Sequence, residues 1–262
     1  MSSELEVIRR KGIVLETAVS GHILIGLIMK LQPIKTQFEL MRVGSDHEGG
    51  YLIPDDIEDI AACFSPGAET KLTFGKDLFD SFGINSHLAD YASIEAPKNV
   101  QPLSFTKKFL GPVNNKECIT LDSWVKGTPE YDSKKDLVLQ MDIEGEEYST
   151  IIATPEEILH RFRIIVIKVH NIDKWGHPAF FKIATSFFDK LLQQFNVVHA
   201  HFNNHGTVVN VSGVELPETI EFTFLSKSRS DSLGKVNSLP DELDRPCDPE
   251  QYDRALPDIW WK

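Results

Sequence analysis

Short apolar runs and longer segments with helical spacing alternate along this chain. Residues 137–141 form an apolar run that is too short for a helix and lacks polar alternation, which is typical of a central strand covered on both faces. Compact apolar runs at 60–65, 84–88 and 164–169 predict further strands, and the alternating run 220–225 predicts a late antiparallel strand. The chain therefore contains the strands of a sheet with a buried centre.

Segments with apolar residues at helical spacing separate these runs. Residues 72–82 and 178–195 carry such spacing, and residues 146–159 are predicted to be helical with an interruption around Pro155. Residues 1–35 also read as helical until a proline ends their pattern. Strand, small-residue loop and helix in succession predict an α/β fold with a Rossmann-like, mostly parallel sheet.

The length of the chain favours one domain with appendages. A chain of 262 residues can bury one large core, and single α/β domains commonly reach this size. We predict an N-terminal helical extension at 1–40, a Rossmann-like domain at 41–225 and a C-terminal extension at 226–262. Ser, Asp and Pro accumulate in the last segment, where we expect Trp260 and Trp261 to dock on the body.

Charge and cysteine usage exclude several classes of partner and compartment. The 27 basic and 39 acidic residues give a formal net charge of −12, which argues against nucleic acid because phosphate binding needs a basic face. Three widely spaced cysteines without metal or redox spacing indicate a reducing cytoplasm. The apolar stretch 23–29 is far shorter than the roughly 20 residues of a spanning helix, so we expect no membrane span. The N-terminal segment is left open as a lid, a homo-oligomer surface or simple packing.

The strongest chemical signal is the run of acidic residues that follows residues 137–141. It contains Asp142, Glu144, Glu146 and Glu147 around Gly145. In open α/β sheets, ligands bind outside the carboxyl ends of the strands, so these carboxylates are expected to face a cleft. The alternative is that they cap the following helix, which accounts for one or two of the acids but not for four.

Three further segments are candidates for a nucleotide-like cofactor. Gly49 and Gly50 permit a tight turn and close backbone approach to a ligand, although a plain hairpin turn has the same signature. Residues 65–67, Ser-Pro-Gly, place backbone N–H groups near a helix N-terminus without the three-glycine dinucleotide fingerprint. Asp90 follows the second strand, where it is either a ribose-binding carboxylate or a solvated loop residue. Trp124 either stacks on an adenine or fills a groove.

Two histidines are candidates for a general base. His170 follows the run 164–169, and His201 lies on a polar strand that begins near residue 197. An unperturbed imidazole titrates close to physiological pH, but a structural role is the alternative for either residue. Strand alternation places His199, His201 and Asn203 on one face.

Taken together, these residues resemble the FkbM-type S-adenosylmethionine-dependent methyltransferases. The matching segments, in order, are residues 48–51, 65–67, 120–122, 142–147, 167–170 and 199–204. The resemblance implies a Rossmann-like seven-stranded sheet with helices on both faces, S-adenosylmethionine as cofactor and O-methylation of a sugar or glycan-type acceptor. This chain departs from the family at Lys168 and Glu48, where an acidic residue and Asp are usual. Lys168 then either pairs with Glu144 or indicates an anionic substrate.

The resemblance also assigns roles to individual residues. Cofactor contacts fall to Gly49, Gly50, Tyr51, Ser65, Pro66, Gly67, Asp90, Asp122 and Asp142. Acceptor contacts fall to Glu144, Lys168, Asn203 and Asn204. Catalysis falls to His170, His201 and Asp142.

A divalent metal and two other functions stay open. Asp142, Glu144 and His170 offer carboxylates and an imidazole, which suit Mg²⁺; otherwise Asp142 contacts the donor or the acceptor directly. The acid-x-acid spacing of Asp142 and Glu144 also fits a metal-dependent glycosyltransferase. A catalytically silent Rossmann-like binding protein is the third reading. Binding of S-adenosylmethionine, of a nucleotide sugar or of neither separates the three.

Overall fold

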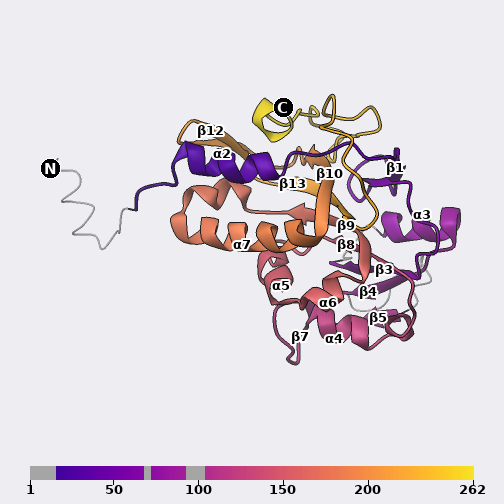
Figure 1. Cartoon of the computed structure of the whole chain (residues 1–262). Helices are drawn as coiled ribbons and strands as arrows, with labels where there is room; N and C mark the ends of the chain where they lie inside the picture. Colours follow the sequence, from indigo (N-terminus) through magenta and orange to yellow (C-terminus); the bar gives the residue numbers. More distant parts are fainter. Residues whose placement is uncertain (1–15, 68–71, 93–103) are drawn as a thin grey trace.

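A seven-stranded sheet forms the centre of the computed structural model, which describes residues 16–67, 72–92 and 104–262 (Figure 1). Its strands are β3 (Ala62–Pro66), β4 (Ser86–Ala89), β5 (Ser104–Thr106), β8 (Leu137–Met141), β9 (Phe162–Val169), β10 (Phe195–Phe202) and β13 (Ile220–Ser226). All five residues of β8 are buried, as expected of a central strand. The apolar run 137–141 is thus confirmed as a strand with the predicted bounds.

The strand order is β10-β13-β9-β8-β3-β4-β5. β13 is antiparallel to both of its neighbours, and the other strands share one direction. Counted among the parallel strands alone, the order is 3-2-1-4-5-6, which is that of a doubly wound nucleotide-binding sheet, with β13 inserted before the last strand. The predicted mixed α/β fold with a mostly parallel seven-stranded sheet is therefore confirmed, and so is the late antiparallel strand.

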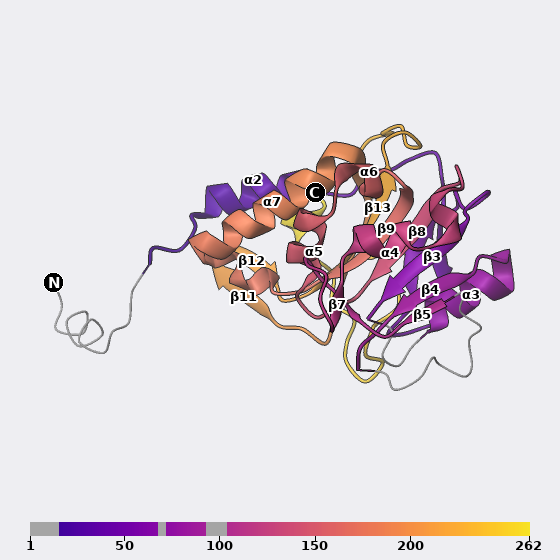
Figure 2. The same ribbon diagram turned by 90° about the horizontal axis from the view of Figure 1, so that it is seen from below.

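One face of the sheet is covered by helices. They are α2 (Gly21–Lys30), α4 (Leu121–Lys126), α5 (Glu147–Ala153), α6 (Glu156–Leu159) and α7 (Pro178–Gln194). Their apolar sides share one core with the strands, in which Phe187 and Phe188 of α7 are fully buried. α2 lies beside α7 in both ribbon views, and Lys30 pairs with Asp189 at 3.0 Å (Figures 1 and 2). Within the described residues, none of the helices combines the length and the apolar character needed to cross a membrane.

The opposite face carries a different cover. α3 (Thr73–Phe82) packs there with a hairpin made of β1 (Leu40–Val43) and β2 (Tyr51–Pro54), and β2 contacts β9, β10 and β13. Every residue of β2 is buried. The expectation of helices on both faces therefore holds only in part, because a two-stranded hairpin occupies much of this face in the described chain.

Short elements complete the fold. They are β6 (Phe109–Leu110), β7 (Cys118–Ile119), β11 (Val208–Val211), β12 (Val214–Pro217), η1 (Pro129–Tyr131), η2 (Ile172–Gly176) and η3 (Asp258–Trp260). Three of these short strands follow one another closely, since β5, β6 and β7 all lie between residues 104 and 119. Residues 93–103 are outside the described chain. Of the helix expected at 1–35, the structure describes residues 16–35, and the helix found there is α2, which spans only residues 21–30. Residues 1–15 are outside the described chain.

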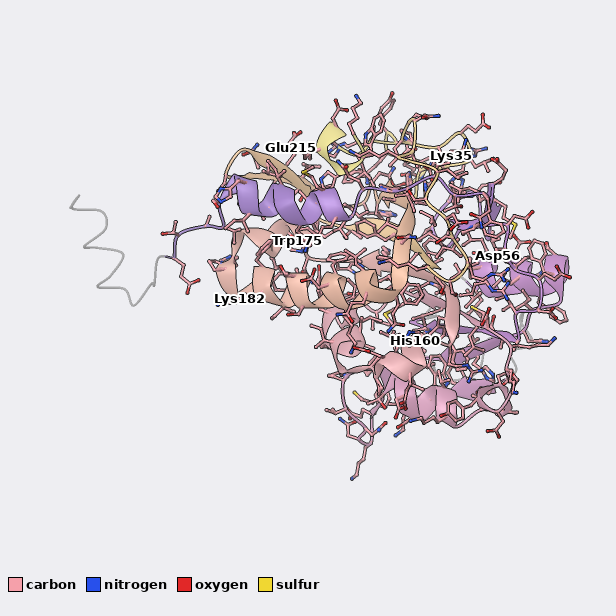
Figure 3. All side chains as sticks on the ribbon, viewed as in Figure 1. Lys35, Asp56, His160, Trp175, Lys182 and Glu215 are labelled. Atoms are coloured by element: carbon pink, nitrogen blue, oxygen red, sulfur yellow. The ribbon has the colours of Figure 1, made fainter. Side chains whose placement is uncertain are left out.

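The end of the chain docks on the helical face. Trp260 is 1% exposed, its ring lies 5.8 Å from that of Trp175, and its indole N–H donates to the Glu215 carbonyl at 3.2 Å. Trp175 and Glu215 mark this docking site in Figure 3. Trp261 stays partly exposed. The predicted docking is therefore confirmed, with Trp260 as the buried anchor.

Candidate functional site

A cavity of about 630 Å³ opens at the carboxyl ends of β3, β4 and β8. The strand order reverses between β3 and β8, because the chain proceeds from β3 toward β5 on one side and from β8 toward β9 on the other. Such a switch point is where open α/β sheets bind their ligands. The predicted acidic cleft and the predicted cofactor loop therefore meet in one place.

Gly67 forms the floor between the two central strands. Its φ is +81°, and a Cβ atom there would lie 1.7 Å from the Asp142 carbonyl oxygen. Its N–H donates to the Ala89 carbonyl at 3.0 Å, so the ends of β3, β4 and β8 are held together at this residue. Only glycine permits both the backbone conformation and the close approach. Ser65 lies two residues earlier in β3 and hydrogen-bonds to Gln140, and both side chains line the cavity.

Asp90 lies at the end of the second strand of the parallel order. It lines the cavity, is 3% exposed, and accepts a hydrogen bond from the Ala92 N–H at 2.7 Å. Its burial argues against the alternative of a solvated loop residue. In nucleotide-binding sheets, an acidic side chain at this point accepts hydrogen bonds from ribose hydroxyls.

Asp142 and Lys168 form a partly buried charged pair at the cavity wall. The Lys168 Nζ atom donates to Glu48 Oε1 at 2.8 Å and to Asp142 Oδ2 at 3.2 Å. Burial raises the pKa of the Asp142 carboxyl to about 6, although Lys168 and His170 lower it. Burial opposes the charge of Lys168, but Asp142 and Glu48 outweigh it and leave the lysine pKa above its ordinary value. Lys168 therefore pairs with Asp142 and Glu48, and not with Glu144.

Glu147 is fully buried and shapes the loop that carries the other acids. Its Oε1 atom accepts the N–H groups of Ile143 and Gly145, each at 3.2 Å, and contacts His170 Nδ1 at 2.9 Å. Within this loop Glu144 has a left-handed φ of 57°. Glu147 lies in the first turn of α5 but binds N–H groups of the preceding loop, and no side chain makes a capping hydrogen bond at the start of this helix, while the other three acids line the cavity.

His170 lies beside the acids that line the cavity. Its Nε2 atom is 3.7 Å from Asp142 Oδ1 and 3.6 Å from Glu144 Oε2. Burial lowers the pKa of this imidazole, but the hydrogen bond to Glu147 and the nearby carboxylates outweigh burial and raise it. Asp142 and His170 therefore lie close together, as the sequence predicts for a divalent cation, but the third residue with a ligand atom within 4.8 Å of both is Glu147, whereas Glu144 is exposed and is not part of this group. Asp142 Oδ1 is buried and has no hydrogen-bond partner among the described residues, which is the state of a ligand atom.

Several residues expected at the site lie outside the cavity that the described residues enclose. Asp122 is in the first turn of α4 and pairs with Lys126 at 2.7 Å. Pro66 ends β3 without lining the cavity. Gly49 lines the cavity, whereas Gly50 belongs to the turn of the β1–β2 hairpin, where a Cβ atom would meet the Ser45 carbonyl oxygen at 1.9 Å.

The polar residues at the end of β10 hold the C-terminal segment instead of lining the cavity. The Asn204 side chain donates to the Asp248 carbonyl at 2.9 Å and accepts its N–H at 2.8 Å. Asn203 donates to Glu221 Oε1 at 3.2 Å, and His201 Nε2 lies 3.3 Å from Asp253 Oδ1. Glu221 belongs to the predicted strand 220–225, but Asp248 and Asp253 lie in a segment without a periodic pattern, so the sequence offers no signal for the contacts of Asn204 and His201.

The structure also decides the role of Trp124 and adds a part of the cavity wall that the sequence does not predict. Trp124 packs edge-on against Phe64 at 5.0 Å in the core, so it fills a groove and does not face a cofactor. The segment of β6 and β7 supplies an apolar part of the wall that was not predicted, including Phe109, Leu110 and Cys118. Two-residue strands carry no readable period, which explains why this wall was missed.

The cavity is acidic. Among the described residues that line it, five carry carboxylates and one, Lys168, carries an ammonium group. The carboxylates belong to Glu48, Asp90, Asp142, Glu144 and Glu146. No protein-family model, curated protein or solved structure matches this chain. The geometry and charge of the cavity therefore carry the functional conclusion.

Proposed function

We propose that this protein is an S-adenosylmethionine-dependent O-methyltransferase that acts on a hydroxyl of a sugar or glycan-type acceptor. One observation carries the proposal: Gly67 and buried Asp90 line a single cavity at the switch point of a doubly wound sheet. That arrangement suits an adenosyl group, with the ribose hydroxyls at Asp90. The sheet order and the FkbM resemblance agree on the class of donor. We also propose, from the sequence alone, that the protein is cytoplasmic and forms a homo-oligomer.

The charge of the cavity favours this donor over a nucleotide sugar. S-adenosylmethionine carries a sulfonium, an ammonium and one carboxylate group, so its net charge is positive and is attracted by a wall with five carboxylates and one lysine. A nucleotide diphosphate carries negative charge, which the same wall repels unless metal ions intervene. The binding tests described below distinguish the methyltransferase from a metal-dependent glycosyltransferase and from a silent binding protein.

The methyl acceptor needs a base, and we assign this role to His170, which does not line the cavity itself but lies beside the lining residues Asp142 and Glu144. In the transfer, the acceptor oxygen forms a bond to the methyl carbon while the carbon–sulfur bond breaks, and the hydroxyl proton goes to the base. The bond to Glu147 occupies His170 Nδ1 and leaves Nε2 directed at Asp142 and Glu144. Because the imidazole must be neutral to accept the proton and its pKa is raised, we expect the rate to rise with pH above 6.5.

A divalent cation such as Mg²⁺ is the alternative to a general base at His170, and Asp142 and His170 would hold it. His170 Nε2 lies 3.7 Å from Asp142 Oδ1, which is buried and accepts no hydrogen bond from the described residues, and ligand atoms of Asp142, Glu147 and His170 lie within 4.8 Å of one another. Such an ion, when bound, would lower the pKa of the acceptor hydroxyl. Glu147 would then orient the imidazole through Nδ1, as carboxylates do for metal-binding histidines.

A matched pair of aspartate variants tests the donor site. Asp90→Asn removes a buried carboxylate that lines the cavity, whereas Asp122→Asn changes a helix residue that lies outside it. In calorimetric titration with S-adenosylhomocysteine, we expect Asp90→Asn to weaken binding roughly tenfold or more, because hydrogen bonds to charged groups contribute about 1.5–3 kcal/mol. Asp122→Asn is expected to bind like the wild type. Equal affinity in the two variants would remove Asp90 from the donor site.

A further inference from the structure

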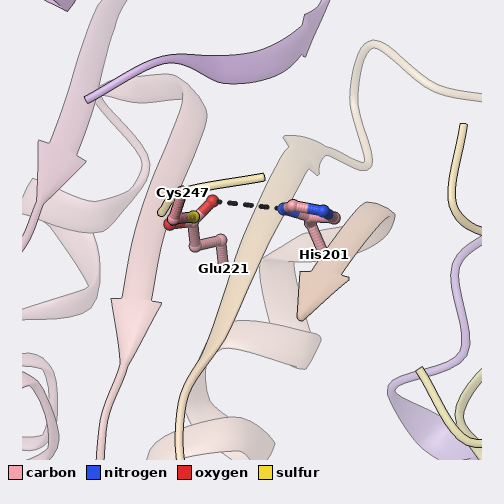
Figure 4. A group of neighbouring side chains, drawn as sticks. All are labelled: His201, Glu221 and Cys247. Carbon is pink, nitrogen blue, oxygen red and sulfur yellow. Dashed lines mark hydrogen bonds and ion pairs between the residues drawn. The ribbon is translucent and has the colours of Figure 1, made fainter. Parts of the chain in front are cut away.

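A second group of side chains that can bind metal lies on the far side of the Glu48 loop. It joins His201 of β10, Glu221 of β13 and Cys247 of the C-terminal segment (Figure 4). All three are buried, with exposed fractions of 5%, 6% and 4%. The Cys247 thiol donates to Glu221 Oε1 at 3.2 Å, and His201 Nδ1 lies 3.7 Å from Glu221 Oε2.

These donor atoms have the chemistry and the spacing of a zinc site. Thiolate, imidazole and carboxylate are the ligands that Zn²⁺ takes in tetrahedral sites, at about 2.0–2.3 Å from the ion. Tetrahedral geometry then places the donors about 3.3–3.8 Å from one another. The separations of 3.2 and 3.7 Å fall close to that range, and all three donor atoms lie within 4.8 Å of one another.

The surroundings of the group resemble the outer shell of a metal site. The second ring nitrogen of His201 lies 3.3 Å from Asp253 Oδ1, although the two atoms do not meet the geometry of a hydrogen bond. A carboxylate near this nitrogen is usual for a histidine that binds metal. The Asn203 amide donates to the Glu221 carboxylate at 3.2 Å. A cavity of about 10 Å³ touches His201 and Glu221 and has room for about one water as a fourth ligand.

We propose that His201, Glu221 and Cys247 bind a zinc ion that fastens the C-terminal segment to the sheet. The ion would join two strands to a segment that lacks helix and strand at Cys247. It would also support the cavity wall, because the Cys247 carbonyl accepts the Glu48 N–H at 3.1 Å and Glu48 pairs with Lys168. The zinc site does not depend on the identity of the methyl donor.

Cobalt substitution tests the site by its thiolate. The full chain is freed of metal under reducing conditions and titrated with Co²⁺, whose thiolate complexes show an intense charge-transfer band in the near ultraviolet. We expect this band to saturate at one Co²⁺ per chain, to disappear on addition of Zn²⁺, and to be absent in Cys247→Ser. Cys118→Ser is the control, because Cys118 lies elsewhere, at the β6–β7 segment. The donors around His170 include no thiolate, so a metal there gives no such band.

A second variant keeps all three ligands and tests the orientation of the imidazole. Asp253→Asn leaves the donor set intact and is expected to weaken Zn²⁺ binding roughly 10- to 100-fold, as the loss of such outer carboxylates usually does. The proposal is overturned if the wild type shows no thiolate band, or if the band survives in Cys247→Ser. Near-ultraviolet circular dichroism shows whether each variant keeps the packing of the wild type, and an unchanged Zn²⁺ affinity in folded Asp253→Asn would contradict the assigned geometry.

Discussion

At the scale of single residues, the pKa of Asp142 is set by influences that oppose one another. Burial works against its charge, while Lys168 at 3.2 Å and His170 at 3.7 Å favour it, and the net result is a pKa of about 6. A carboxylate whose pKa is raised by burial lowers the stability of the folded protein when it is charged, and such groups cluster at functional sites. Asp142 is therefore the residue whose replacement best separates function from stability.

The variant Asp142→Asn is expected to lose donor binding and to gain stability at high pH. The folded-state pKa of about 6 exceeds the ordinary value of 3.8, so the ionisation of Asp142 destabilises the wild type as pH rises through this interval. Two pKa units correspond to about 3 kcal/mol, which is the largest gain that the neutral amide can give above pH 6. Urea unfolding of both proteins from pH 4 to pH 8 measures the difference.

The control for this comparison is Asp122→Asn, which loses only a helix-surface pair with Lys126. Its free energy of unfolding should differ from the wild type by about 0.3–0.5 kcal/mol. If the gain of Asp142→Asn did not grow between pH 4 and pH 6, the buried and charged state assigned to Asp142 would be incorrect.

The sequence predicted the acidic residues of the site but not their partners. Asp142 and Glu144 follow an apolar run whose strand character is readable from a few neighbours. Lys168 pairs with Glu48, which lies 120 positions away, and only the folded sheet brings the two together. The role of Glu147 depends on whether its side chain turns back to the Ile143 and Gly145 N–H groups, and no spacing rule separates that role from lining the cavity.

At the scale of elements, the ends of β3 and β8 meet at Gly67 and form the floor of the site. The strand β3 and the helix α3 were both predicted from their periodicity, and small residues between them indicated a close approach. The β1–β2 hairpin was expected only in part, because a pair of glycines marks the turn but says nothing about which face it covers. The strands β6 and β7 cannot be predicted from the sequence, since two residues are too few to show an alternating pattern.

Two glycine variants test this element. Gly67→Ala places a Cβ atom 1.7 Å from the Asp142 carbonyl at a φ of +81°, so β3 and β8 must separate at the cavity floor. We expect lower stability and loss of S-adenosylhomocysteine binding, measured by thermal unfolding with and without the ligand. Gly26→Ala in α2 has open space around the new atom and should gain about 0.5–1 kcal/mol with binding unchanged. Normal ligand binding by Gly67→Ala would contradict the floor that we assign to this residue.

At the scale of the whole molecule, the C-terminal segment connects opposite parts of the fold. Trp260 docks on the helical face beside Trp175, while Asp248 and Asp253 reach the ends of β10. The composition of this segment predicted a loosely packed extension, and only its final tryptophans hinted at docking. Nothing in the sequence indicates that Asn204 and His201 contact this segment instead of a ligand, because Asp248 and Asp253 lie more than 40 positions away in a stretch without a periodic pattern.

The docking predicts unequal effects for the two terminal tryptophans. Trp260→Ala removes a fully buried indole and should lower the free energy of unfolding by about 3–5 kcal/mol. Trp261→Ala removes a partly exposed ring over which the Lys262 ammonium lies, and we expect a loss of about 1 kcal/mol. Denaturant unfolding measures both, and equal losses would mean that Trp260 does not anchor the chain end.

The central claim is that the cavity between β3 and β8 binds S-adenosylmethionine. Calorimetric titration of the wild-type protein with S-adenosylhomocysteine, beside UDP and GDP sugars and with or without Mg²⁺, tests it most directly. We predict binding of S-adenosylhomocysteine in the micromolar range without Mg²⁺ and no binding of the nucleotide sugars. Binding of the nucleotide sugars alone would identify a glycosyltransferase, and no binding of any of these ligands would point to a silent binding protein. Either result would contradict the methyltransferase.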